Sequence, residues 1–463
     1  MLSFRLRRLL WFPLFSVLAE CALSAQIPPV LIPTDPFEHV VDFEIVKRYG
    51  GKEPTSERVF MQLPHSPASI NPLVLAFHGA YFDRHWVGSG GGTQLAVALE
   101  ELMDEATNRG WIVASLEGGE APDHANGTYG GPETHQRISA VIDDIDELWG
   151  VDPDRIYTIG HSMGAADAAS YAARRQDPER WRVAAVFSWS GVLSTRDLVG
   201  DAYQRWFWAS APPDQPLGVG KLPYIASSVV QVLPSCLSGA CNNPGSPLAD
   251  EALVFNLAQV PFKVTHADTD GCFATCAYAT AQSLAASTNE LPYLFFDPSF
   301  NNNHLSTEDF DAAAICDFFE PEHLSALGRR MYKTVAVEDV RYFYFDVSLI
   351  NPSGPGVFGW DMPRTQNKLV LTAPKDLIAL RFSVDGGAPV SAPLVSTSAL
   401  TIVCNNSVPT LAFTLENFLT APNTVFLNGS SANTTDWEYD SVAKILKLKA
   451  LHQNSTFIWV ISP

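Results

Sequence analysis

Residues 160–164, with the sequence Gly-His-Ser-Met-Gly, constrain the fold of this chain more than any other stretch. They follow a stretch at 155–159 that is typical of a short buried strand and precede a run of small residues at 165–175 with helix character. A serine between two glycines in this context predicts a tight, strained turn, because glycine has no Cβ to block the neighbouring chain. The turn lifts the Ser162 hydroxyl above the sheet. It also places the Met163 amide at a helix N-terminus, where negative charge is stabilised.

Predicted strands and helices alternate on both sides of this turn. The strands are expected at 39–46, 58–63, 73–77, 111–116, 155–159, 183–189, 261–265 and 291–296, and the helices at 93–108, 133–149, 165–175 and 307–319. The first two strands read as an antiparallel sheet edge. The alternation predicts a doubly wound, mostly parallel sheet with helices on both faces.

Two regions depart from this alternation. Residues 194–259 are rich in Pro, Trp and small residues and contain no clear strand. Long insertions of this kind are typical of lids and binding loops, so we predict a cap over a substrate cleft; a structural surface excursion is the alternative. After about residue 340, short alternating strands separated by Gly, Pro, Asn and Asp predict a smaller all-β, sandwich-like domain. We place the first domain at 26–335 and the second at 336–463.

The N-terminus has the pattern of a secretory signal peptide over residues 1–25. Arginines at 5, 7 and 8 precede an apolar run, and small residues follow up to Ala25. No later segment is long and apolar enough to predict a membrane span. Six cysteines remain after the signal, and an even set in an oxidising compartment predicts three disulfides: Cys236, Cys241, Cys272, Cys276, Cys316 and Cys404. The five N-x-S/T sequons predict a glycoprotein: Asn126, Asn405, Asn428, Asn433 and Asn454.

The formal charge of −20 argues against nucleic acid as a partner, since its phosphates would be repelled. No pair of cysteines has the two-residue gap typical of structural zinc, so no metal is expected.

A serine hydroxyl needs a base, and in this type of fold an acid and then a histidine follow the serine along the chain. His304 follows the last predicted strand and is the candidate base. Asp268 and Asp270 both follow the preceding strand, and either can be the acid. The amide of Ala80, in the loop after the strand at 73–77, is predicted to assist the Met163 amide in binding an oxyanion.

Residues 65–320 resemble the secreted α/β-hydrolase esterases that include polyhydroxybutyrate depolymerases and feruloyl and acetylxylan esterases. The resemblance is carried by the His-Gly pair at 78–79, by Val-Asp-Pro-Asp-Arg-Ile-Tyr at 151–157 leading into the serine turn, and by residues 266–270. The last of these, His-Ala-Asp-Thr-Asp, is similar to the family pattern His-Gly-x-x-Asp with Ala267 in place of glycine. The resemblance implies that Asp270 is the acid.

The resemblance also implies the chemistry. It predicts a secreted serine carboxylic-ester hydrolase that works through an acyl-enzyme and needs no cofactor. Its expected substrates are esters, including polymeric or plant-cell-wall-derived ones. A serine peptidase of prolyl-oligopeptidase type and an inactive hydrolase fold serving as a binding ectodomain are the alternatives. The C-terminal domain either binds a carbohydrate or polymer surface or shields the hydrolase; its aromatic residues Trp437, Tyr439, Phe457 and Trp459 read as core.

Overall fold

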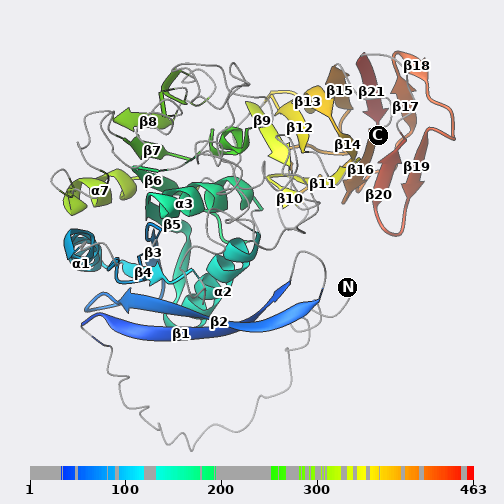
Figure 1. The fold of residues 1–463 in the computed structure, drawn as a ribbon. Helices are drawn as coiled ribbons and strands as arrows, with labels where there is room; N and C mark the ends of the chain where they lie inside the picture. The colour runs from blue at the N-terminus through cyan, green and yellow to red at the C-terminus, as the bar shows by residue number, and fades with distance from the viewer. Residues whose placement is uncertain are drawn as a thin grey trace, which may run out of the picture.

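A computed structural model provides the fold (Figure 1). The structure describes residues 33, 35–46, 51–80, 82–88, 93–118, 132–177, 180–191, 193, 252–258, 260–266, 281–282, 284–286, 291, 293–297, 304, 307, 310–324, 331–336, 341–350, 355–363, 365–386, 392–405, 411–449 and 456–463. The predicted signal peptide, Asn126 and Asn454 lie outside these residues, as does the predicted cap from 194 to 251.

An eight-stranded sheet occupies the first part of the chain, in the order β1-β2-β4-β3-β5-β6-β7-β8. Its strands are β1 (Phe37–Val46), β2 (Lys52–Gln62), β3 (Asn71–Phe77), β4 (Ile112–Leu116), β5 (Val151–His161), β6 (Ala185–Trp189), β7 (Phe262–Thr265) and β8 (Leu294–Asp297). Strand β2 is antiparallel to both of its neighbours, and every neighbouring pair from β4 to β8 is parallel. The predicted mostly parallel sheet with an antiparallel edge is therefore confirmed.

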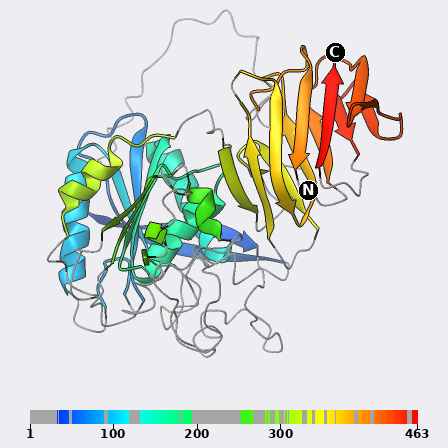
Figure 2. The same cartoon turned by 90° about the horizontal axis from the view of Figure 1, so that it is seen from above.

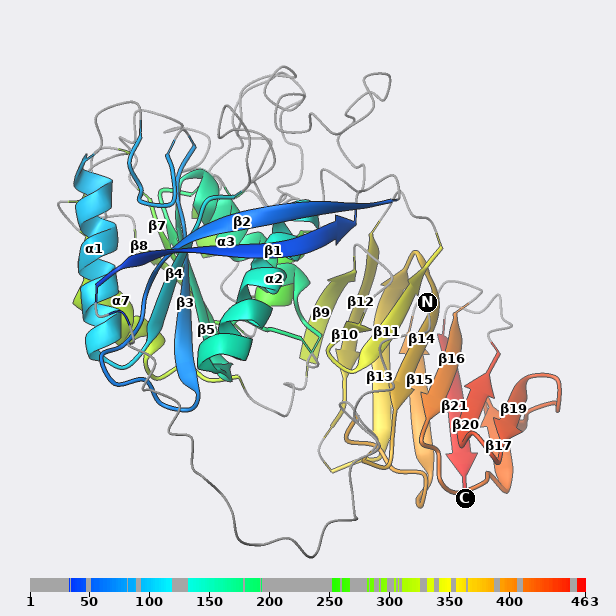
Figure 3. The same ribbon diagram turned by 90° about the horizontal axis from the view of Figure 1, so that it is seen from below.

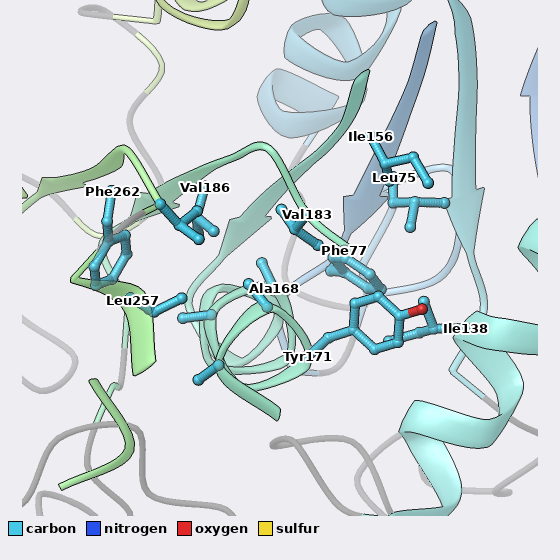
Figure 4. Close-up of a cluster of buried hydrophobic side chains, with 14 of the residues drawn as sticks. Leu75, Phe77, Ile138, Ile156, Ala168, Tyr171, Val183, Val186, Leu257 and Phe262 are labelled. Atoms are coloured by element: carbon cyan, nitrogen blue, oxygen red, sulfur yellow. The ribbon is translucent and has the colours of Figure 1, made fainter. Parts of the chain in front are cut away.

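Helices cover both faces of this sheet, as the alternation predicted. They are α1 (Thr93–Asn108), α2 (Pro132–Trp149), α3 (Met163–Arg174), the short 3-10 helix η2 (Leu253–Leu257) and α7 (Ala312–Phe319). Side chains of α2, α3 and η2 share one core with alternate residues of β3, such as Leu75 and Phe77 (Figure 4). Those of α1 and α7 share the opposite core with Val74 and Ala76. Strand β3 is thus buried on both faces, which is why its residues 72–77 are continuously apolar.

One end of the predicted cap belongs to this core. Helix η2 falls within the range 194–259, and Leu253, Val254 and Phe255 are all buried. It packs against α3 and against β9 (Met331–Ala336). The apolar side chains of this short helix are removed from water in the core, as those of the longer helices are.

Two further sheets form the C-terminal part. Six strands lie in the order β10-β11-β14-β16-β20-β19: β10 (Arg341–Tyr342), β11 (Phe345–Leu349), β14 (Leu377–Ser383), β16 (Ala412–Glu416), β20 (Ile445–Leu448) and β19 (Trp437–Asp440). Seven lie in the order β18-β17-β21-β15-β13-β12-β9; besides β9 these are β18 (Ser430–Ser431), β17 (Thr424–Leu427), β21 (Thr456–Ser462), β15 (Leu400–Asn405), β13 (Lys368–Lys375) and β12 (Gly356–Asp361).

The strands of the C-terminal part form two neighbouring layers (Figure 2). The inner faces of these two sheets share one core, with alternating burial along strands such as β15 and β21. This is the layered arrangement expected of a sandwich. Phe457 and Trp459 are buried in it, which confirms the core prediction for these two, while Trp437 and Tyr439 are partly buried against it. Among the residues of the two sheets whose burial the structure describes, no aromatic side chain is exposed. The predicted domain boundary after residue 335 lies inside β9, and the division of the chain into two domains stays a prediction.

Strand β9 joins the two parts (Figure 3). The buried side chain of Asn256, on η2, donates from Nδ2 to the Ala173 and Val335 carbonyls, at 2.9 Å each. Its Oδ1 accepts from the Val335 amide at 2.8 Å. Val335 itself is buried with side chains of α2 and α3 in the first core. One amide side chain therefore connects the C-terminal end of α3, η2 and the first strand of the C-terminal sheets.

The prediction of three disulfides is wrong for Cys316, which has a free thiol. Cys316 lies on α7 and is fully buried in the core under α1, where it packs as a small apolar side chain. Burial raises the pKa of its thiol to about 12, although Arg109 opposes the rise. Cys404 is buried in the C-terminal core, and the other four cysteines lie outside the described residues.

None of the helices that the structure describes is both long enough and apolar enough to cross a membrane.

Candidate active site

The turn at residues 160–164, here named the serine turn, joins β5 to α3. Ser162 has φ 54° and ψ −113°, a backbone conformation that side-chain-bearing residues rarely adopt. A Cβ at Gly160 would lie 2.1 Å from the Gly164 carbonyl oxygen, and one at Gly164 would lie 2.2 Å from the Phe77 carbonyl oxygen. Both distances are far below contact, so both positions require glycine. The predicted strained turn is confirmed.

The backbone of Ser162 is held while its hydroxyl stays available. The Ser162 amide donates to the Trp189 carbonyl, at the end of β6, at 2.9 Å. Ser162 is the N-cap residue of α3, yet its side chain makes no capping hydrogen bond. Met163 is the first residue of the helix, so its amide lies at the positive end of the helix dipole, as predicted.

The structure brings His304 to this hydroxyl. His304 Nε2 lies 2.8 Å from Ser162 Oγ, although 142 residues separate the two along the chain. Both side chains are buried, His304 with 7% of its surface exposed and Ser162 with 3%. The distance is within the range for a nucleophile and its base. An imidazole in this position can take the hydroxyl proton as the oxygen attacks.

The loop after β3 closes the other side of the serine turn. A Cβ at Gly79 would lie 3.3 Å from Ser162 Cβ, so the backbone of this loop runs directly beside the serine. The Phe82 amide donates to the Gly79 carbonyl at 3.3 Å, which closes a turn that contains Ala80. The structure therefore places Ala80 next to the residue that touches Ser162, and its role as an oxyanion donor remains a prediction.

His78 braces this loop. Its ring nitrogens lie 2.7 Å from the carbonyl oxygen of Gly79 and 2.9 Å from that of Glu117, which follows β4. The side chain is buried, with 4% of its surface exposed. These contacts give His78 a structural role in the loop after β3.

Asp270 and Asp268 lie outside the described residues. The residue that precedes them, His266, is buried at the end of β7, and its amide donates to the Asp297 carbonyl at 3.4 Å. Strand β8 is the parallel neighbour of β7, with Thr265 opposite Asp297. The segments that lead to the predicted acid and to His304 thus leave the same edge of the sheet from adjacent strands.

Sequence reasoning missed the role of His161. This residue is fully buried, and its Nε2 lies 2.7 Å from the main-chain carbonyl oxygen of His304. Its ring centroid lies 4.9 Å from those of Trp189 and His304. No local signal identifies the contact, because it joins the end of β5, in the interior of the sheet, to a residue that follows the edge strand β8, 143 positions later in the chain.

A small cavity lies behind the serine turn, lined by residues that include Glu57, His78, Arg137, Met163 and Asp167. Its volume of about 10 Å³ is enough for about one water and excludes an ester substrate. Burial raises the pKa of the Glu57 carboxyl, although Arg137 and the Gly118 amide oppose the rise. Among the described residues, no group of three or more His, Cys, Asp or Glu side chains is arranged to hold a metal ion.

No family model and no curated protein matches the chain. Solved structures do. A ferulic acid esterase matches at 18% identity and a TM-score of 0.38, over 61% of this chain and 96% of its own. An acylaminoacyl peptidase from Pyrococcus horikoshii matches at 16% identity and a TM-score of 0.40, over 63% of this chain and 42% of its own. The acetyl xylan esterase from Aspergillus awamori matches at 16% identity and a TM-score of 0.32, over 54% of this chain and 80% of its own. These likenesses are distant, so any function must rest on the geometry of Ser162 and His304.

Proposed function

We propose that this protein is a serine hydrolase of the α/β-hydrolase class that cleaves carboxylic esters through an acyl-enzyme. The observation that carries the proposal is the distance of 2.8 Å between His304 Nε2 and Ser162 Oγ, at a turn whose glycines admit no side chain. A buried hydroxyl in contact with an imidazole and beside a helix N-terminus is the arrangement that acyl transfer needs.

In the proposed reaction Ser162 Oγ attacks the ester carbonyl carbon while His304 Nε2 takes the hydroxyl proton. The carbonyl oxygen becomes an oxyanion, which the amides of Met163 and Ala80 stabilise. When the C–O bond to the alcohol breaks, His304 returns its proton to the alcohol oxygen. A water molecule then attacks the acyl-enzyme with His304 as base and releases the acid. Asp270, or Asp268 in its place, holds the imidazole and stabilises its charged form.

An active-site-directed fluorophosphonate tests this proposal. It should modify wild-type protein at Ser162 only, as mapped by peptide mass spectrometry, and Ser162→Ala should take no label. A p-nitrophenyl acyl ester should be hydrolysed by wild type, while Ser162→Ala and His304→Ala should lose at least about 10³-fold in kcat. Labelling at another residue would refute the site. Cleavage of a peptide amide at a comparable rate would favour the peptidase reading instead, and no labelling at all would favour the binding ectodomain.

Secretion is a second part of the proposal. The N-terminal signal pattern supports it, and so does the exposure of Asn428 and Asn433 on the C-terminal sheets, since glycans need an accessible amide. Expression of the full chain in a eukaryotic cell should give protein in the medium whose electrophoretic mobility increases after treatment with a peptide N-glycosidase. Retention in the cell without glycans would contradict this part and leave the hydrolase proposal intact.

The C-terminal sheets have two predicted roles, surface binding and a structural role. A binding experiment on the same expressed full chain distinguishes them. Surface binding predicts that the full chain co-sediments with an insoluble polyester or cell-wall preparation. Their inward aromatic side chains and their attachment through Asn256 instead favour a structural role, which predicts no co-sedimentation.

A further inference from the structure

His161 contacts the candidate base from within the serine turn. Its Nε2 lies 2.7 Å from the main-chain carbonyl oxygen of His304. A carbonyl oxygen only accepts hydrogen bonds, so Nε2 must carry a proton and donate it. The contact is buried. A hydrogen bond is stronger in the protein interior than in water, and its loss would deprive the His304 carbonyl oxygen of this donor. The bond therefore ties the backbone of the base directly to the residue that precedes the nucleophile.

The ring that makes this bond is itself fixed on several sides. It packs edge-on against Trp189, with ring centroids 4.9 Å apart, and edge-on against Phe82 at 6.4 Å. A Cβ at Gly79 would lie only 2.9 Å from its Nδ1, so the backbone of the loop after β3 also approaches the ring closely. His161 thus lies between the loop that carries Ala80 and the backbone of His304.

We propose that His161 is a positioning residue: its Nε2–H bond to the His304 carbonyl sets the distance from the base to Ser162 Oγ. This inference rests on the proposed function. The same ring contacts Gly79, so one side chain holds the base and the oxyanion loop in register with the serine. A misplacement of about 1 Å can cost about 100-fold in rate, which makes such a contact consequential.

Three substitutions separate positioning from packing. His161→Gln supplies an amide N–H about as far from the backbone as Nε2, while the amide of His161→Asn is one bond shorter. His161→Leu fills the space without a donor. We expect kcat for a p-nitrophenyl ester to fall about 10- to 100-fold in His161→Leu and His161→Asn, with KM within about twofold of the wild-type value. The Gln variant should retain kcat within about fivefold of wild type, because it keeps the donor.

The rate of fluorophosphonate labelling at Ser162 should follow the same order, since it depends on the same base. His135→Gln is the matched control, because His135 is equally buried but bonds Ser170 Oγ at 3.0 Å and does not touch the site. Its kcat should equal that of wild type. Melting temperatures of all variants show whether the changes in rate follow loss of structure.

Equal kcat values for His161→Leu, His161→Asn and wild type would overturn the positioning role. Equal losses of kcat in His161→Gln and His161→Asn would also overturn it. If His161→Leu does not fold, the comparison of His161→Gln with His161→Asn is sufficient by itself. Failure of the proposed function is a separate outcome, since it would appear as wild-type protein that neither hydrolyses the ester nor takes label at Ser162. In that case a crystal structure of His161→Asn tests the geometry: an unchanged distance from His304 Nε2 to Ser162 Oγ would overturn the inference.

Discussion

At the scale of single residues, the glycines of the serine turn carry the sharpest steric demand. A Cβ at Gly164 would meet the carbonyl oxygens of Phe77 and His78 at 2.2 and 2.6 Å, and neither backbone atom can move without displacing β3. We expect Gly164→Ala to lower the free energy of unfolding by about 3 kcal/mol and to abolish the proposed esterase activity.

Gly110→Ala is the control for this substitution. Gly110 has φ +84° but no atom within 4 Å of the Cβ position, so only the backbone penalty applies. Urea unfolding should give a loss of about 1 kcal/mol with activity retained. Comparable losses in both variants would show that crowding at the serine turn is not the cause.

A buried histidine should make stability depend on pH. Burial, followed by the charges of Arg174 and Arg175, holds the pKa of His135 well below 6.5. The unfolded chain takes up this proton near pH 6.5 and the folded chain does not, so the free energy of unfolding falls as pH drops below about 6.5. The slope from this residue is at most about 1.4 kcal/mol per pH unit.

His135→Gln removes this titration while keeping a hydrogen-bonding group for Ser170. The difference in unfolding free energy between variant and wild type, measured from pH 5 to 8, should grow in favour of the variant on acidification. A difference that does not change with pH would mean that His135 is not buried in its neutral form.

At the scale of elements, the join between β2 and α2 depends on a buried ion pair. Arg137 Nη1 lies 3.1 Å from Glu57 Oε2, and Glu57 Oε1 accepts from the Gly118 amide at 2.7 Å. Arg137→Met leaves the carboxylate buried without its charge partner, which costs about 3–5 kcal/mol in comparable cases. Adding Glu57→Gln, whose oxygen still accepts from Gly118, should recover most of that loss.

The pH dependence of this loss has a definite sign. Burial raises the pKa of Glu57, so the folded chain binds this proton more tightly than the unfolded chain. Stability therefore decreases as pH rises above the ordinary value near 4.5, and removal of Arg137 strengthens the effect. Urea unfolding of Arg137→Met should show a larger loss at pH 8 than at pH 5. An equal loss at both values would mean that the carboxyl group is solvated.

The elements that sequence predicted well are those whose pattern is local. The ends of α1 are the predicted ones, because Thr93 and Gly110 mark them within the chain itself. Helix α7 begins at Ala312 rather than at residue 307, because Asp311 caps it with a side-chain bond to the Ala314 amide at 2.9 Å. Strand β12 has no clear local signal, since its two glycines have low strand propensity, and pairing with β9 and β13 selects it.

The candidate site divides in the same way. Ser162 and Met163 follow from a local motif, and His304 from its order along the chain. The contact between His161 and His304 does not, because it spans 143 residues and depends on how the sheet folds.

At the scale of the whole molecule, the join between the two parts of the chain depends on Asn256. Its three hydrogen bonds reach Ala173 and both backbone groups of Val335, and the side chain is 1% exposed. The amide of Phe343 adds a bond to the Gln176 carbonyl, just beyond α3, at 3.1 Å. Because α3 begins directly after Ser162, the C-terminal sheets are attached to the helix that follows the candidate nucleophile. They cannot be removed without exposing the core beneath β9.

Asn256→Leu should therefore destabilise the full chain by about 2–4 kcal/mol, since it leaves buried backbone groups without partners. Asn367→Leu is the matched control: Asn367 also bonds both backbone groups of one residue, Val395, but it does so at the surface, where water replaces the lost bonds. We expect the control to lose less than about 1 kcal/mol in urea unfolding. If the two variants lose the same amount, the connection through Asn256 does not hold the two parts together. If Asn256→Leu unfolds in two separate transitions and the control does not, the hydrogen bonds of Asn256 are what make the two parts of the wild-type chain unfold as one unit.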